Sequence, residues 1–164
     1  PKVFESNEEV LDHLRAVLPT WTEPEEPGTE GLDVAIGFEE VSMETRRHDY
    51  KLVVSLTNNG QAPVHLTHLE MEFPSLVSRG LEGPTIVKNR RTPTHDFYRI
   101  ESGALLAPIY GGDSRRIFER NYYVDDDIYF NRADALRLPV TVRVYPEGAD
   151  PITVQKPLAQ LQVF

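Results

Sequence analysis

The chain has 164 residues, a length that fits one domain with a sizeable core. Its apolar fraction is 40%, its charged fraction is 26% and its formal net charge is −9. This composition argues against disorder of the whole chain and against non-specific binding to nucleic acid. Cysteine is absent, which excludes disulfide frameworks, thiolate metal sites and cysteine nucleophiles. The compartment stays open, with the cytoplasm slightly favoured.

The N-terminal part predicts a helix followed by a linker. Residues 6–18, SNEEVLDHLRAVL, have apolar side chains at helical spacing, and Ser6 and Glu9 have the spacing of a capping box. Residues 19–31 are rich in proline and glutamate and show no apolar period. Because such a helix and linker are typical of the tail of a preceding module, and the chain begins with Pro1, we expect a piece of a larger multidomain protein.

From residue 32 onward the pattern changes to short runs of alternating apolar and polar residues between Gly, Pro and Asn turns. These runs cover residues 32–44, 50–58, 63–73, 85–88, 97–100, 104–110, 114–124, 138–146 and 151–164. The alternation changes phase at residues 39–40 and again within 64–73, which predicts bulges. Between the later runs, residues 131–137, NRADALR, predict one short helix.

This pattern predicts an all-β chain without the crossover helices that a parallel sheet needs. We expect an antiparallel β-sandwich of seven to nine strands, with a barrel as the alternative. The expected organisation is an N-terminal helix and acidic linker over residues 1–31, and a sandwich domain over residues 32–164. No apolar run is long enough to span a membrane and no signal peptide is evident, so we expect no membrane insertion.

The stretch LTNNGQAPVHL, residues 56–66, is the clearest turn signal. Asn59 and Gly60 both accept a positive φ at low cost, and Pro63 suits the first residue of an outgoing strand. The pattern predicts a connection between two adjacent antiparallel strands, without need of a ligand.

Two motifs carry a resemblance to a known fold. The order strand, Asn-x-Gly-x-x-Pro-Val, strand resembles the early hairpin of immunoglobulin-like accessory domains, especially bacterial ones. YGGDSRRIFERNYYV, residues 110–124, is similar to their mid-domain strand after a Gly-plus-acid turn. The resemblance implies an immunoglobulin-like sandwich and no particular activity, because these motifs specify turns and fold analogy does not transfer function.

Catalytic and metal-binding patterns are weak in this chain. His65 and His68 are three apart, so on a regular strand they point to opposite faces. The acidic run 125–127 does not continue with EF-hand spacing. No Gly-x-Ser-x-Gly elbow or P-loop is present. We therefore expect no enzyme activity, no metal and no cofactor.

Three arginine doublets stand out in an acidic chain: Arg46-Arg47, Arg90-Arg91 and Arg115-Arg116. The first two fall in expected turns, and guanidinium groups suit carboxylate partners. We expect a non-catalytic interaction or scaffolding module that binds a protein partner or neighbouring domain through Arg46, Arg47, Arg90 and Arg91. The alternatives are a carbohydrate-binding sandwich, which needs several exposed aromatic side chains on one face, and a small hydrolase.

Overall fold

The computed structural model describes residues 31–44, 47–77, 81, 86–101, 107–125 and 132–163. The helix expected at residues 6–18 lies outside the described residues, and so does the linker except for Gly31. The described residues form nine strands, one short α-helix and one 3-10 turn. None of these described helices is long and apolar enough to cross a membrane.

Four strands form the first sheet, in the order β6-β2-β1-β9. They are β6 (Ser114–Asp125), β2 (Arg47–Asn58), β1 (Leu32–Glu44) and β9 (Gln162–Val163). The three long strands pair antiparallel, while the short β9 runs parallel to β1.

Five strands form the second sheet, in the order β4-β5-β3-β7-β8, with every neighbouring pair antiparallel. They are β4 (Ile86–Arg91), β5 (His95–Ile100), β3 (Leu66–Pro74), β7 (Pro139–Pro146) and β8 (Ile152–Pro157). The described strands thus form two separate sheets rather than one closed barrel, and the expected all-β class is confirmed.

The core lies between the two sheets because successive residues of a strand face opposite sides. In β2 the inward positions include Leu52, Val54 and Leu56, and each of these side chains is fully buried. In β7 the alternating valines Val142 and Val144 are equally buried, as the sequence pattern predicted. A single hydrophobic cluster joins residues of both sheets, so the sheets pack face to face as a β-sandwich.

Local irregularities also follow the sequence. The register of β1 shifts between Glu40 and Ser42, where the alternation changes phase. A second shift lies between Leu66 and His68 in β3. Both expected bulges are therefore present. The short helix expected at residues 131–137 corresponds to α4 (Ala133–Leu136).

The prediction for residues 56–66 is wrong in one respect, because the strands on either side are not adjacent. β2 belongs to the first sheet and β3 to the second, so this connection crosses from one sheet to the other. The described glycines with a positive φ are Gly31, Gly112 and Gly148, and Gly60 does not belong to them. The turn is instead closed by the side chain of Asn58, whose oxygen accepts the Gly60 backbone N–H at 2.9 Å.

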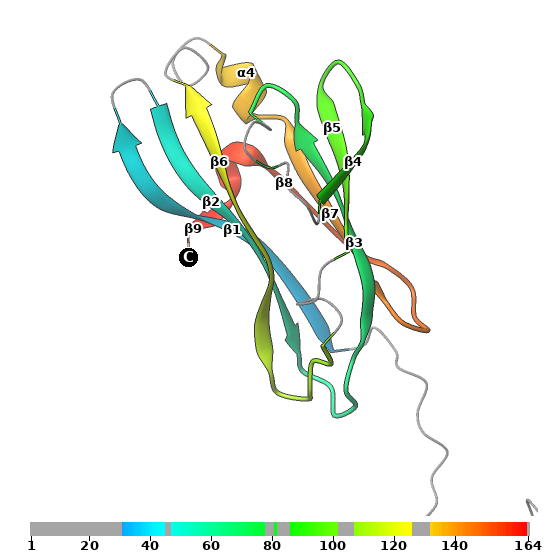
Figure 1. Ribbon diagram of the computed structural model, residues 1–164. Helices are drawn as coiled ribbons and strands as arrows, with labels where there is room; N and C mark the ends of the chain where they lie inside the picture. The colour runs from blue at the N-terminus through cyan, green and yellow to red at the C-terminus, as the bar shows by residue number, and fades with distance from the viewer. Residues whose placement is uncertain are drawn as a thin grey trace, which may run out of the picture.

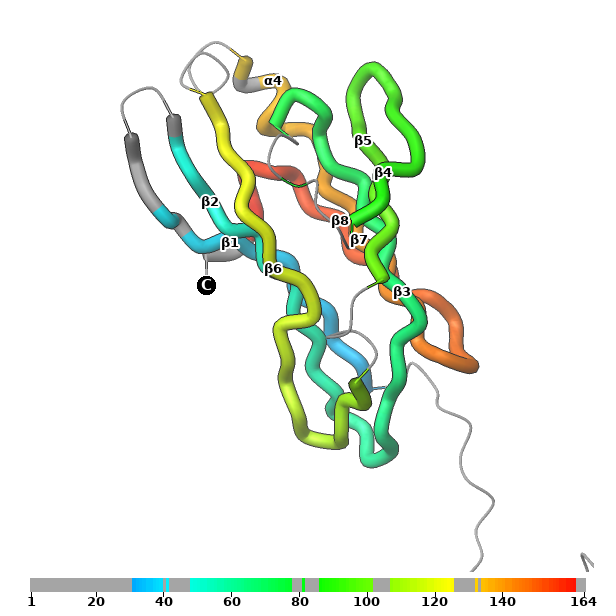
Figure 2. Tube along the Cα trace, in the orientation of Figure 1, coloured from blue at the N-terminus to red at the C-terminus, as the bar shows by residue number. Residues whose placement is uncertain are grey.

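The connection between the sheets, residues 59–65, lies against a second segment, residues 107–113, at the same end of the sandwich. Backbone hydrogen bonds join Asn58 to Gly112 and Asp113, and Val64 to Ile109. Figure 2 shows residues 59–65 and 107–113 running together at the lower end. At the opposite, upper end the two sheets diverge, and α4 and the β4–β5 turn lie there (Figure 1).

Candidate interaction site

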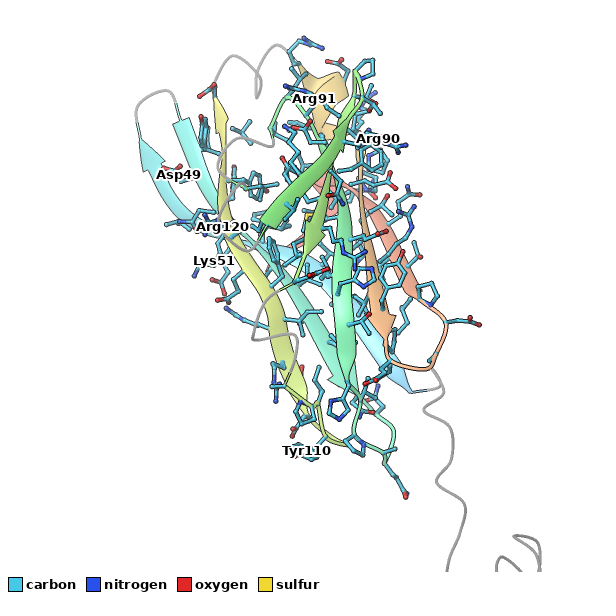
Figure 3. All side chains as sticks on the ribbon, turned by 45° about the vertical axis from the view of Figure 1, so that its right-hand side comes forward. Asp49, Lys51, Arg90, Arg91, Tyr110 and Arg120 are labelled. Atoms are coloured by element: carbon cyan, nitrogen blue, oxygen red, sulfur yellow. The ribbon has the colours of Figure 1, made fainter. Side chains whose placement is uncertain are left out.

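The hairpin formed by β4 and β5, residues 86–100, is the most basic part of the described chain. It carries Lys88, Arg90, Arg91 and Arg99 against one carboxylate, Asp96, which gives a formal charge of +3 with His95 neutral. The whole chain has a net charge of −9. We call residues 86–100 the basic hairpin. Figure 3 labels Arg90 and Arg91 at the upper end of the sandwich.

The inner face of the basic hairpin holds a buried carboxylate. Only 1% of the Asp96 side chain is exposed to solvent. Its Oδ2 lies 2.8 Å from Lys88 Nζ, and its Oδ1 lies 3.2 Å from Arg91 Nε. The Tyr98 hydroxyl donates to the same carboxylate at 3.5 Å. A buried carboxylate needs such partners because its desolvation is otherwise costly, so Lys88 and Arg91 have a structural role here.

The outer face of the basic hairpin presents different chemistry. The guanidinium carbon of Arg90 lies 4.0 Å from the centre of the Phe97 ring, a cation–π contact that holds the charge over a flat aromatic surface. Val87 is 59% exposed on this side, opposite Arg99 across the ladder. Arg99 in turn lies 2.7 Å from Glu101. This face therefore combines an oriented positive charge with exposed apolar surface.

The four arginines that the sequence proposed for partner binding are thus placed differently. Arg91 points toward Asp96, and Arg90 lies on the outer face over Phe97. Arg46 lies outside the described residues. Arg47 is the first residue of β2, and its backbone pairs with Asp125 of β6. β2 begins at the end of the sandwich that carries the basic hairpin, but in the other sheet (Figure 1).

The third doublet has structural contacts. Arg115 donates to the carbonyl oxygens of Ala107 and Pro108, at 3.1 and 3.0 Å. Arg116 pairs with Glu39 at 2.6 Å and with Glu119 at 2.8 Å. The hydrogen bond from Arg116, together with a second one from Lys51, holds the pKa of Glu39 below its ordinary value. The guanidinium of Arg116 is therefore paired with carboxylates of this chain itself.

Sequence reasoning missed Lys88, Asp96 and Phe97. Their signal was present in HDFYRI, where strict alternation puts Asp96 on the same face as Tyr98 and Ile100. A carboxylate on an apolar face predicts a cationic partner nearby. The identity of that partner depends on the register between β4 and β5, which the alternation does not specify.

Of the two histidines that the sequence singled out, His65 precedes β3, and His68 lies within β3 at the end of its register shift. His65 is exposed, whereas the His68 ring stacks on Tyr145 with ring centres 4.1 Å apart. Burial, aided by nearby Arg99, lowers the pKa of His68 below its ordinary value. In the described ranges no three or more His, Cys, Asp or Glu side chains are grouped to hold a metal ion.

The described residues also line two hollows. An apolar one of about 230 Å³ is lined by side chains of the first sheet, Phe38, Tyr50 and Tyr122 among them, and by Leu136 of α4. The Tyr50 and Tyr122 rings stack at 5.5 Å, and burial raises the pKa of Tyr122. A polar hollow of about 440 Å³ is lined by Lys51, Glu119, Arg120 and Asn121.

Exposed aromatic surface is sparse in the described part of the chain. The large apolar side chains that are exposed there are Val41, Leu76, Val87 and Tyr110. Tyr110, at 58% exposure, is the aromatic residue of this set and lies at the lower end in Figure 3. Phe97, Tyr123 and Tyr145 are half-buried.

No protein-family model matches this chain, and no curated protein matches it either. Among solved structures, the chain is similar to a GH20 exo-β-N-acetylglucosaminidase from Vibrio harveyi, with 9% identity and a TM-score of 0.41. The match covers 80% of this chain and 19% of that protein. A similarity at this level indicates neither activity nor ligand.

Proposed function

We propose that this chain is a non-catalytic interaction module with an immunoglobulin-like fold. Its basic hairpin binds an acidic, extended segment of a protein partner or of a neighbouring domain. The observation that carries the proposal is the outer face of the hairpin, where Arg90 is held over Phe97 beside exposed Val87.

The strand order supports the immunoglobulin-like part of the proposal. In that fold, strands A, B and E share one sheet and strands C, F and G share the other. Here β1, β2 and β6 share one sheet in the order β6-β2-β1, and β3, β7 and β8 share the other in the order β3-β7-β8. The connections from β2 to β3 and from β6 to β7 both cross between the sheets, as the B–C and E–F connections do.

Charge and exposure support the binding site. An arginine that is already held by an aromatic ring loses less conformational freedom on binding a carboxylate than a fully mobile one. The local charge of +3 on a chain of −9 attracts acidic segments to this place rather than elsewhere on the surface. Val87 beside it adds apolar contact, so the best ligand alternates acidic and apolar residues.

The test is a fluorescence anisotropy titration with a fluorescein-labelled peptide of alternating Glu and Val residues. Arg90→Glu is expected to weaken binding by about tenfold or more without lowering the melting temperature, and Arg90→Lys by less. Binding of the wild type should also weaken with salt, because exposed charges are screened over about 8 Å at physiological ionic strength.

The matched control is Arg116→Glu, which makes the same change in net charge on the other sheet. If it weakens binding as much as Arg90→Glu, the peptide senses only overall charge and the hairpin is not the site. Equal binding of a peptide of alternating Lys and Val residues would also overturn the proposal.

A further inference from the structure

The apolar hollow of about 230 Å³ belongs to the first sheet, whereas the basic hairpin belongs to the second. Phe38 of β1, Tyr50 of β2 and Tyr122 of β6 supply aromatic rings to its walls, and α4 and the 3-10 turn η1 (Leu158–Gln160) supply aliphatic side chains. An apolar protein cavity of about 150 Å³ is large enough to bind benzene. The hollow therefore has room for a benzene ring that carries a small substituent.

The rings in the wall already contact one another in the geometries that aromatic pairs prefer. Phe38 meets Tyr50 edge to face, with ring centres 5.2 Å apart and an interplanar angle of 83°. Tyr50 and Tyr122 are stacked, with centres 5.5 Å apart. On its other contact, Tyr122 meets Phe73 of the core edge to face at 5.3 Å, which holds its ring in place. Aromatic pairs favour separations of about 4.5–7 Å, so one more ring in the hollow extends this array.

Tyr122 also brings a polar atom to this apolar wall. The residue is 4% exposed, yet its hydroxyl has no hydrogen-bond partner in the part of the chain that the structure describes. Burial raises the pKa of Tyr122, so the hydroxyl keeps its proton and remains a donor. A buried tyrosine hydroxyl usually has a partner, because an unmade hydrogen bond is costly. An acceptor oxygen on a molecule in the hollow would supply that partner.

The lining residues also determine the charge of a suitable ligand. None of those that the structure describes has an Asp, Glu, Lys, Arg or His side chain. A charged molecule would lose its hydration there without gaining an ion pair, which is unfavourable. The chemistry of the hollow thus favours a neutral ring with one acceptor.

We propose that this hollow is a binding site for a small neutral aromatic molecule, whose acceptor oxygen takes a hydrogen bond from the Tyr122 hydroxyl. The site is separate from the basic hairpin, so its occupancy does not depend on the binding of an acidic segment there.

The experiment uses two probes and the chain of 164 residues. Acetophenone is a neutral ring with one carbonyl oxygen, and toluene is the matched ring without an acceptor. Each is titrated into isotope-labelled protein while the backbone amide shifts are followed by NMR. Acetophenone is expected to bind saturably with a dissociation constant of about 0.1–1 mM, and toluene more weakly. The shift changes should centre on residues next to Phe38, Tyr50 and Tyr122.

Tyr122→Phe tests the hydrogen bond, since it keeps the ring and removes only the hydroxyl. It should weaken acetophenone binding by about three- to tenfold and leave toluene binding unchanged. The fold is expected to tolerate this change, because the hydroxyl has no partner among the described residues. Equal effects on both probes, or no effect on acetophenone, would contradict the role assigned to Tyr122.

Ala159→Phe tests the location, because Ala159 is an exposed residue of the lining. Its new ring should block binding of both probes. Gln160→Phe is the matched control, since Gln160 is the next residue and equally exposed, and it should bind both probes as the wild type does. Should Ala159→Phe fail to fold, Ala159→Leu replaces it.

Three results would overturn the proposal. The first is the absence of saturable binding of acetophenone up to about 10 mM, which is also the result expected if another segment of the chain fills the hollow. The second is a set of shift changes centred away from the lining residues. The third is a loss of binding in Gln160→Phe as large as that in Ala159→Phe.

Discussion

The side-chain amide of Asn58 lies 2.9 Å from the carbonyl oxygen of Ile109, a residue 51 positions further along the chain. The same amide donates to the carbonyl oxygen of Ala62 at 2.8 Å. One buried side chain therefore ties the crossing between the sheets to the segment that leads into β6. These two hydrogen bonds link both segments at the lower end of the sandwich.

We predict that Asn58→Ala lowers the free energy of unfolding by about 2 kcal/mol or more, because it removes three hydrogen bonds of a buried side chain, two to the carbonyl oxygens of Ala62 and Ile109 and one from the Gly60 N–H. Asn58→Asp should cost at least as much, since a carboxylate would face the carbonyl oxygens of Ala62 and Ile109. Urea denaturation measures both. The exposed neighbour Asn59 is the control, and Asn59→Ala should change stability by less. Equal losses at both positions would contradict the role assigned to Asn58.

A second prediction concerns the close approach of two turns. A Cβ at Gly111 would contact the carbonyl oxygen of Gly60 and lie 2.9 Å from that of Gln61. Gly111→Ala should therefore destabilise the fold by about 1–3 kcal/mol through overpacking. Gly112→Ala has open space but a φ of 82°, so its cost should be about 1 kcal/mol from backbone strain alone.

Gly60 provides the comparison for this pair. Because its φ is not positive, Gly60→Ala should cost less than Gly112→Ala, contrary to what the turn motif alone suggests. Thermal unfolding of the three variants gives the order. If Gly60→Ala is the most destabilising of the three variants, the stability of the lower end depends on the backbone conformation of Gly60 and not on the close contact between Gly60 and Gly111.

The third prediction separates the residues of the basic hairpin by their effect on stability. Lys88→Met removes a hydrogen bond to the buried Asp96 carboxylate and should cost about 1.5–3 kcal/mol. Arg90→Met removes only an exposed cation–π contact and should cost less than about 1 kcal/mol. Chemical denaturation measures the difference.

Arg91 is the informative case within the hairpin. Arg91→Glu should destabilise strongly, because it sets a second carboxylate beside Asp96. For that reason a double reversal of Arg90 and Arg91 confounds binding with stability, whereas Arg90→Glu alone does not. If Arg91→Glu leaves the melting temperature unchanged, the pairing with Asp96 contributes nothing measurable.

The fourth prediction is a pH dependence that originates at His68. Burial lowers the pKa of His68 below its ordinary value of 6.5, so the unfolded state binds this proton more tightly than the folded state. The contribution of His68 is therefore fully present above pH 6.5 and is lost as the pH falls through the folded-state pKa. The charges facing His68 are those of Arg99, Glu70 and Glu101.

His68→Phe keeps an aromatic ring against Tyr145 and removes the titrating group. Melting temperatures of the variant and wild type, measured at steps below pH 6.5, should converge toward high pH and separate toward low pH, with the variant more stable. Parallel curves would mean that His68 titrates with an unperturbed pKa.

The sequence by itself determined the class of the fold and much of its local detail. Alternation in residues 138–146 showed which valines face inward, because neighbouring residues of a strand point to opposite sides. Changes of phase located the bulges in β1 and β3 for the same reason. These features depend only on residues close together in the chain, so a local pattern contains them.

Only the tertiary structure decided which strands are neighbours, and with them the candidate site. The alternation of β2 is the same whether β3 or β6 lies beside it, so the supposed hairpin at Asn59–Gly60 could not be told from a crossing between sheets. From the sequence, the adjacent residues Arg90 and Arg91 are expected to have the same role. The register with β5 instead places Arg91 beside the buried Asp96 and Arg90 over the Phe97 ring. Likewise, Arg120 comes to lie opposite Leu52, a residue 68 positions earlier, only through the register between β6 and β2. Pairing between distant residues is chosen by the packing of the whole core, and no local stretch of sequence specifies it.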